Sequence, residues 1–267
     1  MKTQRSAVLA LILTGTLGAH DLYLMPDNFT PKAGTQLRVV FHNGDEFPIA
    51  TSATKPERLR NTRLLSRAGK AEFEKITAQP TFTTAEVQVP GAGTAILTAN
   101  TLPNFIELDP KKFTDYLTHE NLTNALQWRE AHGETGKPGR ERYTKFVKSL
   151  LKSDKGDDYF KEKTGLTIEI IPEVDPYSLK PGQALPVQVL FHGKPAAAVA
   201  VESAWLEAGK AEMQTFGRTN AQGRITLPIK ATGPHRVHAI VMERCAEPQA
   251  ADWESSWASL TFAIPVR

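Results

Sequence analysis

Residues 37–42 read LRVVFH, a short run of β-branched and aromatic side chains that favours a β-strand. Gly34 precedes this run and an Asn-Gly pair follows it, so turn residues bound it on both sides. Two further short runs, residues 86–89 and 95–98, are separated by a Pro-Gly turn. Short strands divided by turn signals in this way predict a β-sandwich.

The C-terminal part of the chain has the same kind of pattern. Strand-like runs occur at residues 166–171, 184–191, 199–205, 224–229, 235–242 and 259–264. The motif Gly-x-x-Leu-x-Val occurs in both parts of the chain, at residues 34–39 and 182–187. This series predicts a second sandwich of the immunoglobulin or transthyretin-like kind, built on the same architecture as the first.

The middle of the chain has helical rather than strand periodicity. Asp109-Pro110 is a helix-start signal, and apolar residues follow it at helical spacing. A second helix is expected over residues 142–151, because five large apolar or aromatic side chains lie on one face of a helix there. These five are Tyr143, Phe146, Val147, Leu150 and Leu151.

The patterns together predict a mainly β protein with two β-sandwich domains. The domains would span residues 20–106 and 165–267, with a helical insertion over residues 107–164 between them. A chain of 267 residues is long enough for two such domains. Cys245 is the single cysteine, so no intramolecular disulfide can form, and we expect it to be a small buried apolar residue.

The first nineteen residues have the three-part pattern of a secretory signal. Lys2 and Arg5 form a basic start, residues 7–13 are apolar, and Gly18 and Ala19 suit a signal peptidase. An uncleaved anchor is the alternative, but the apolar stretch is shorter than the ~20 residues that span a bilayer. We therefore expect a signal peptide over residues 1–19, export to the periplasm, and no membrane span after cleavage.

Composition and motifs exclude several classes of function. The formal net charge is only +3, and no concentrated basic face is visible, so binding of nucleic acid is not expected. The chain has no Gly-x-Ser-x-Gly elbow, phosphate loop, dinucleotide fingerprint or His-Glu-x-x-His motif. We therefore expect a protein that is not an enzyme.

His20 would become the first residue of the mature chain after cleavage behind Ala19. Its free α-amine and a ring nitrogen can then chelate one metal ion, the arrangement called a histidine brace. Nitrogen ligands in a square-planar or tetragonal set favour Cu(II) or Ni(II). The alternative is that an amino-terminal histidine is incidental and frayed.

His238 and His42 are the further candidate metal ligands. On a strand, His238 shares one face with Arg236 and Ile240, whereas His235 lies on the other face. A buried core histidine is the alternative interpretation for His238, and a solvated hairpin residue is the alternative for His42. We expect one divalent transition-metal ion, Ni, Co or Cu, as the bound cofactor.

Trp253 and Trp257 belong to an aromatic and acidic cluster, DWESSW at residues 252–257. Two indole rings beside two carboxylates can bind a sugar by stacking and hydrogen bonding. We favour the alternative that both rings pack beneath the helical segment, because tryptophan is usually recruited for its large buried area.

Six short motifs follow one another along the chain after the expected signal peptide. They are HDLYLMP at residues 20–26, NGDEFP at 43–48, LKPG at 179–182, FHGKP at 191–195, TNAQGR at 219–224 and SLTF at 259–262. In this order they resemble an exported bacterial family known as domain of unknown function 4198. The resemblance covers nearly the whole expected mature chain.

The resemblance implies a periplasmic, metal-associated and non-catalytic role, because that family is described as associated with nickel or cobalt uptake. It implies a ligand role for His20 alone, and a membrane metal transporter as the partner. One departure bears on the metal. Leu22 occupies the third mature position, where the amino-terminal copper/nickel motif has histidine, so a second imidazole must come from elsewhere in the fold.

Three functions therefore stay open at this point. The first is a periplasmic metal-binding protein that supports metal uptake or handling. The second is an envelope scaffold, or a module that binds glycans or proteins, without metal. The third is an oxidative copper enzyme that uses the same brace. Metal binding is the preferred hypothesis.

Overall fold

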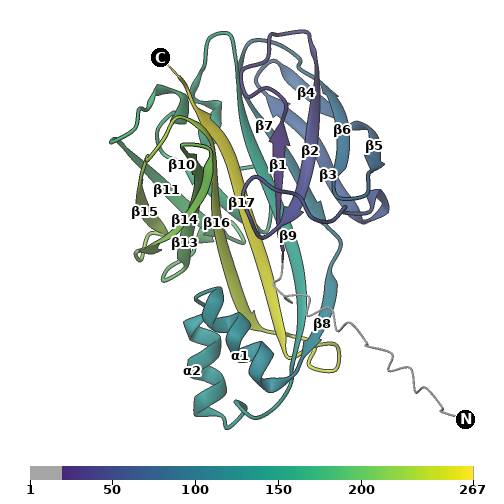
Figure 1. The fold of residues 1–267 in the computed structure, drawn as a ribbon, viewed down its shortest axis with the longest axis vertical. Helices are drawn as coiled ribbons and strands as arrows, with labels where there is room; N and C mark the ends of the chain where they lie inside the picture. Colours follow the sequence, from purple (N-terminus) through teal and green to yellow (C-terminus); the bar gives the residue numbers. More distant parts are fainter. Residues whose placement is uncertain (1–19, 267) are drawn as a thin grey trace, which may run out of the picture.

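The computed structural model describes residues 20–266, and it confirms the predicted fold class: the protein is mainly β. The strands of this region form three sheets, one of nine strands and two of four (Figure 1). The predicted signal peptide, residues 1–19, lies outside the described residues. No helix within residues 20–266 has both the length and the apolar character that a membrane crossing requires.

Two sheets are small and one is large. The first contains, in order, β1 (Asp21–Pro26), β2 (Gln36–Gly44), β6 (Thr83–Gln88) and β5 (Glu74–Ala78). The second contains β10 (Ile168–Pro172), β11 (Ala184–Phe191), β12 (Lys194–Pro195) and β15 (Arg224–Pro228), the last paired with β11.

The large sheet extends through both halves of the molecule. Its order is β14 (Lys210–Arg218), β13 (Ala200–Glu207), β16 (Gly233–Arg244), β17 (Trp253–Ile264), β9 (Gly139–Ser153), β7 (Gly93–Thr101), β3 (Leu59–Ser66) and β4 (Gly69–Glu72), with β8 (Asn104–Leu108) also paired to β9. Single turns of 3-10 helix span Pro56–Arg58, Asp158–Lys161 and Pro176–Ser178.

Strand β9 is shared by the two sandwiches. Val147 and Leu151 contribute to the core beneath β1, β2 and β6. Phe146 and Leu150, which alternate with them, contribute to the core beneath β10, β11 and β15. Because β9 pairs antiparallel with β7 and parallel with β17, one strand joins the two halves into a continuous sheet.

The predicted helix over residues 142–151 is wrong, because this segment lies within β9. Both faces of the strand are buried, so its apolar residues do not alternate with polar ones. Phe146, Val147, Leu150 and Leu151 have the spacing i, i+1, i+4 and i+5, which also fits one face of a helix.

The predicted first helix is confirmed. Helix α1 (Pro110–His119) begins at the N-cap Asp109, whose carboxylate accepts a hydrogen bond from the Lys112 amide at 2.9 Å. Helix α2 (Thr123–Ala131) follows directly. Both helices lie against the lower ends of β16 and β17 (Figure 1), where Trp253 and Trp257 are buried in their shared core.

Strand β1 also has two buried faces. Leu22 and Leu24 point into the first sandwich, while Tyr23 packs with Phe47 and Ala204 on the other side. Side chains of β17 hold its backbone, since Ser259 donates to the Leu22 carbonyl at 2.8 Å and Thr261 to the Leu24 carbonyl at 2.6 Å. The beginning of β1, with His20 just before it, therefore lies at the junction of the two halves.

Candidate functional site

His20 is fixed at the start of β1. Its Nδ1 lies 2.9 Å from Asp45 Oδ1, and the Lys145 ammonium donates a hydrogen bond to its carbonyl oxygen. Its side chain is 36% exposed. The residue is therefore anchored at two points and still reachable from solvent, which differs from a frayed end.

His42 lies on β2 directly opposite Tyr23. The two rings stack with centroids 5.3 Å apart, and His42 Nδ1 is buried without a hydrogen-bond partner in residues 20–266. Burial lowers the pKa of His42, and a hydrogen bond with the backbone of Pro48 opposes this decrease in part. The half-buried His42 is thus a neutral imidazole near neutral pH, and its setting is not that of a solvated hairpin residue.

His238 lies on β16 and is almost completely buried. Its Nδ1 lies 3.4 Å from Asp21 Oδ1, and its buried Nε2 has no hydrogen-bond partner among the residues that the structure describes. Burial lowers the pKa of His238, and the nearby Asp21 carboxylate opposes that change. A carboxylate on one ring nitrogen that leaves the other free is the usual setting of a metal-bound histidine.

Asp21, the neighbour of His20 in the chain, belongs to a buried ionic network. Arg236 has no exposed side-chain surface and pairs with Asp21 at 2.5 Å and with Glu202 at 2.8 Å. Burial alone would raise the pKa of Asp21, but the charges of His238 and Arg236 outweigh it, so the pKa lies below its usual value. The network connects β1, β13 and β16.

Lys145 of β9 lies on the other side of His20. Its ammonium donates to the His20 carbonyl and to Asn43 Oδ1 (3.1 Å), and it lies 5.7 Å from the centroid of the Tyr143 ring and 5.9 Å from that of Trp257. It forms no ion pair with any carboxylate in residues 20–266. Burial lowers the pKa of Lys145 to about 8.

A small polar cavity lies between the end of α1 and strands β13 and β16. Its walls include His119, Glu120, Glu202 and His238. Burial, together with the negative charges of Asp21 and Glu202, raises the pKa of Glu120 to about 9. Glu120 is therefore an uncharged carboxylic acid at neutral pH, which lowers the negative charge of this region.

We expect Glu120→Gln to stabilise the protein at pH 8 by ~1–2 kcal/mol and to have little effect at pH 5. The folded protein holds a proton on Glu120 that the unfolded chain releases above about pH 4.5, so Glu120 lowers stability as pH rises from there to about 9. Glutamine removes that dependence while keeping the neutral shape. Thermal unfolding at both pH values measures it, with the exposed Glu130→Gln as control. Equal changes at the two pH values would contradict the expectation.

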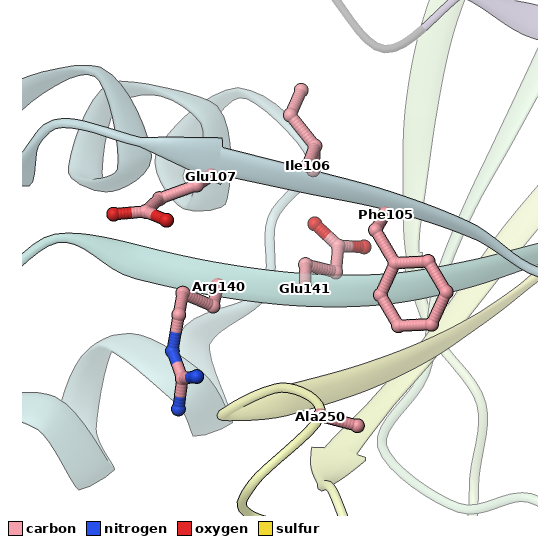
Figure 2. Close-up of a pocket in the computed structure, with 6 residues that line it drawn as sticks. All are labelled: Phe105, Ile106, Glu107, Arg140, Glu141 and Ala250. Carbon is pink, nitrogen blue, oxygen red and sulfur yellow. The ribbon is translucent and has the colours of Figure 1, made fainter.

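A further buried acid lies at the β8 end of β9. In Figure 2 the carboxylate of Glu141 points toward β8, between Ile106 and Phe105. It accepts hydrogen bonds from Tyr116 (3.0 Å) and Ser255. Burial raises the pKa of Glu141 to about 7, although these hydrogen bonds oppose the change. The adjoining cavity measures about 160 Å³.

The three predicted metal ligands occupy different surroundings. His20 contacts Asp45, His42 stacks on Tyr23, and His238 contacts Asp21. Within residues 20–266, no three side chains of His, Cys, Asp or Glu are grouped so that they could hold a metal ion. A free α-amine on His20 is a backbone group, so it would be a further nitrogen ligand beside these side chains.

The charged residues around His20 were not predicted from the sequence. Asp21, Glu202, Arg236 and Lys145 come from four strands, so no local spacing marks them. The one available signal was the placement of Arg236 and His238 on the same strand face, and both do contact Asp21. The packing of Trp253 and Trp257 beneath the helices was predicted and is confirmed.

The comparisons with known proteins identify the family. The model of a family described as a domain of unknown function, DUF4198, matches residues 17–243. The chain belongs to the DUF4198 family. The resemblance noted in the sequence is therefore confirmed, while an association with nickel or cobalt uptake stays a prediction. No curated protein matches the chain.

Solved structures give only distant similarities. The D0-D1 domain of intimin is 13% identical, covering 91% of this chain and 97% of that one, with a TM-score of 0.23. The Escherichia coli adhesin FdeC is 14% identical over 93% of this chain and 64% of that one, with a TM-score of 0.24. Fibronectin(III)-like modules of Clostridium thermocellum CbhA are 10% identical over 90% and 93%, with a TM-score of 0.21. Similarity at this level carries no information about what this chain binds.

Proposed function

We propose that this protein binds one divalent transition-metal ion, Ni, Co or Cu, through His20 as the first residue of the exported chain. The α-amine and Nδ1 of His20 are two nitrogen donors on one residue. The Asp45 carboxylate, 2.9 Å from that Nδ1, is a third donor at the same place. This donor set fits divalent copper or nickel, which accept nitrogen and oxygen ligands in tetragonal arrangements.

The anchoring of His20 is the observation that carries the proposal. An amino-terminal residue without contacts would lose conformational entropy on binding a metal. Here the Lys145 ammonium holds the His20 carbonyl, and Asp45 orients the ring. Much of that entropy cost is therefore already met by the fold.

His42 and His238 are the proposed sources of a further imidazole. Each has a buried ring nitrogen without a hydrogen-bond partner in the described part of the chain, and burial favours the neutral form that ligates metals. His238 also has Asp21 on its opposite nitrogen, as metal-bound histidines commonly do. The metal would be cargo in the periplasm, passed to a membrane transporter.

Calorimetric titration with Cu(II), Ni(II) and Co(II) tests the proposal. The protein beginning at His20 is expected to bind one ion tightly, and a form with one extra residue before His20 is expected to bind it ~100-fold more weakly, or ~2.8 kcal/mol. The extension converts the α-amine into an amide but leaves every side chain in place. Affinity should also fall as pH drops through the imidazole range.

Variants of two aspartates complete the experiment. Asp45→Asn should weaken the metal by about tenfold or more, whereas Asp27→Asn, in an exposed pair with Arg38, should not. Equal weak binding by the His20 form and its extended form would contradict the proposal. That result would favour the scaffold alternative, in which the sandwich surfaces bind a partner protein.

A further inference from the structure

A third cavity, of about 250 Å³, lies between β2, the segment before β3, and strands β7 and β9. Three cationic side chains line it: Lys55, Arg58 and Lys145. Its other polar walls include Asn43 and Asn104. Among the described residues that line the cavity there is no aspartate or glutamate, so its three positive charges have no carboxylate in these walls.

The three cations also lack ion pairs with other parts of the described chain. Arg58 donates to the backbone carbonyls of Leu102 (3.0 Å) and Pro103 (2.8 Å), which are uncharged. Within residues 20–266, neither Lys55, Arg58 nor Lys145 forms an ion pair with a carboxylate. The charged side chains nearby in the ionic network of Asp21, by contrast, are paired.

Lys145 is the decisive residue, because only 8% of it is exposed. Buried ammonium groups are normally paired with an anion, since burial without a partner is costly. Its two hydrogen bonds, to the His20 carbonyl and to Asn43, use two of its three N–H donors. The third N–H has no hydrogen-bond acceptor among the described residues, and the carboxylates of Asp21 and Asp45 act on the ammonium only from beyond ion-pair distance.

We propose that this cavity binds a small organic acid with two or more carboxylates. Lys145 would receive one carboxylate at the closed end, and Lys55 and Arg58 would receive another at the outer side. The lining hydroxyls of Thr54 and Thr101 suit the hydroxyl or carboxyl groups of such an acid. The volume exceeds the needs of a single phosphate or acetate ion.

The proposal is independent of metal binding by His20. The two sites share Lys145, which contacts the His20 carbonyl, yet the anion requires neither the α-amine nor the imidazole of His20. Metal-free protein is therefore the right material, because bound metal could itself recruit an organic acid. A negative result for citrate binding would then not contradict metal binding by His20, and a negative result for metal binding would not contradict citrate binding.

Calorimetric titration of the metal-free protein with citrate tests this site, with acetate and inorganic phosphate as comparison anions. We expect one saturable citrate site that Lys145→Met weakens by about tenfold or more, the order expected for loss of a charge-assisted hydrogen bond. Lys55→Gln, at an exposed position that leaves folding intact, should weaken it by about threefold. Lys32→Gln, an exposed lysine outside the cavity, should leave it unchanged.

Added salt should weaken citrate binding, because the outer part of the cavity is open to screening ions. Absence of saturable citrate binding would overturn the proposal, and so would citrate affinity that neither Lys145→Met nor Lys55→Gln changes. Phosphate binding as tight as that of citrate would overturn the assignment to an organic acid.

Discussion

Arg236→Met is expected to lower the free energy of unfolding by about 3–5 kcal/mol, the cost of leaving a buried charge without its partner. Arg236 is fully buried and lies 2.5 Å from Asp21 and 2.8 Å from Glu202. Methionine approximates its length but not its charge. Among the described residues, the Asp21 carboxylate would then keep one ion-pair partner, His238, whose Nδ1 is 3.4 Å away.

Urea unfolding measures this effect, and Arg38→Met provides a matched control. Arg38 pairs with Asp27 at 3.4 Å, but both side chains are about half exposed, so its loss should cost less than ~1 kcal/mol. The double variant Asp21→Asn with Arg236→Met should recover part of the loss, because the unpaired charge is gone. If Arg236→Met lowered the free energy of unfolding by less than Arg38→Met, Asp21 would be solvated rather than buried.

Most strands were predictable because their signals are local. LRVVFH lies within β2, and the predicted strand over residues 184–191 coincides with β11. Alternation, β-branched residues and flanking turns mark a strand with one face in a core and the other in solvent. The N-cap Asp109 was predictable for the same reason, since a helix start depends on neighbouring residues.

Strand β9 was not predictable as a strand, because its pattern depends on the sheet around it. A strand with a core on each side loses its alternation, and four apolar residues in adjacent pairs then resemble a helical stripe. Here Val147 and Leu151 enter one core while Phe146 and Leu150 enter the other. Only the arrangement of both sandwiches reveals that role.

The surroundings of His20 were predictable only in part. The sequence marks His20 itself and places Arg236 with His238 on one strand face. It does not indicate that Asp21 meets that face or that Lys145 of β9 reaches the His20 carbonyl. Such contacts join residues far apart in the chain, so only the assembled sheet brings them together.

Glu169→Leu is expected to destabilise the protein by about 3–5 kcal/mol, because it leaves a buried ammonium without its ion-pair partner. Lys148 of β9 is 2% exposed and lies 3.1 Å from Glu169 of β10, which is 4% exposed. Glu169 is the sole hydrogen-bond partner of the Lys148 side chain among the described residues. Removing the carboxylate therefore leaves a buried cation without a neighbouring negative charge.

Lys148→Met should lower the free energy of unfolding by roughly half as much, ~1–3 kcal/mol. The reason is that a buried group that keeps other hydrogen bonds loses less stability than one left with no partner. Glu169 would keep three donors, the Thr164 amide (2.9 Å), the Thr164 hydroxyl (2.7 Å) and the Gly165 amide (2.9 Å). The double variant should recover the part of the loss that comes from the unpaired ammonium, since an apolar pair can replace a buried ion pair, while the Thr164 and Gly165 donors still lack the Glu169 acceptor.

Chemical unfolding of the two single variants and the double variant measures this asymmetry. Lys75→Gln, which removes an exposed ion pair with Glu86, should change stability by less than ~1 kcal/mol. Because β9 belongs to both cores, each variant should still unfold in one transition, with the midpoint shifted for both halves together. A second transition in Glu169→Leu, or a larger loss in Lys148→Met, would contradict the role assigned to β9 and its buried pair.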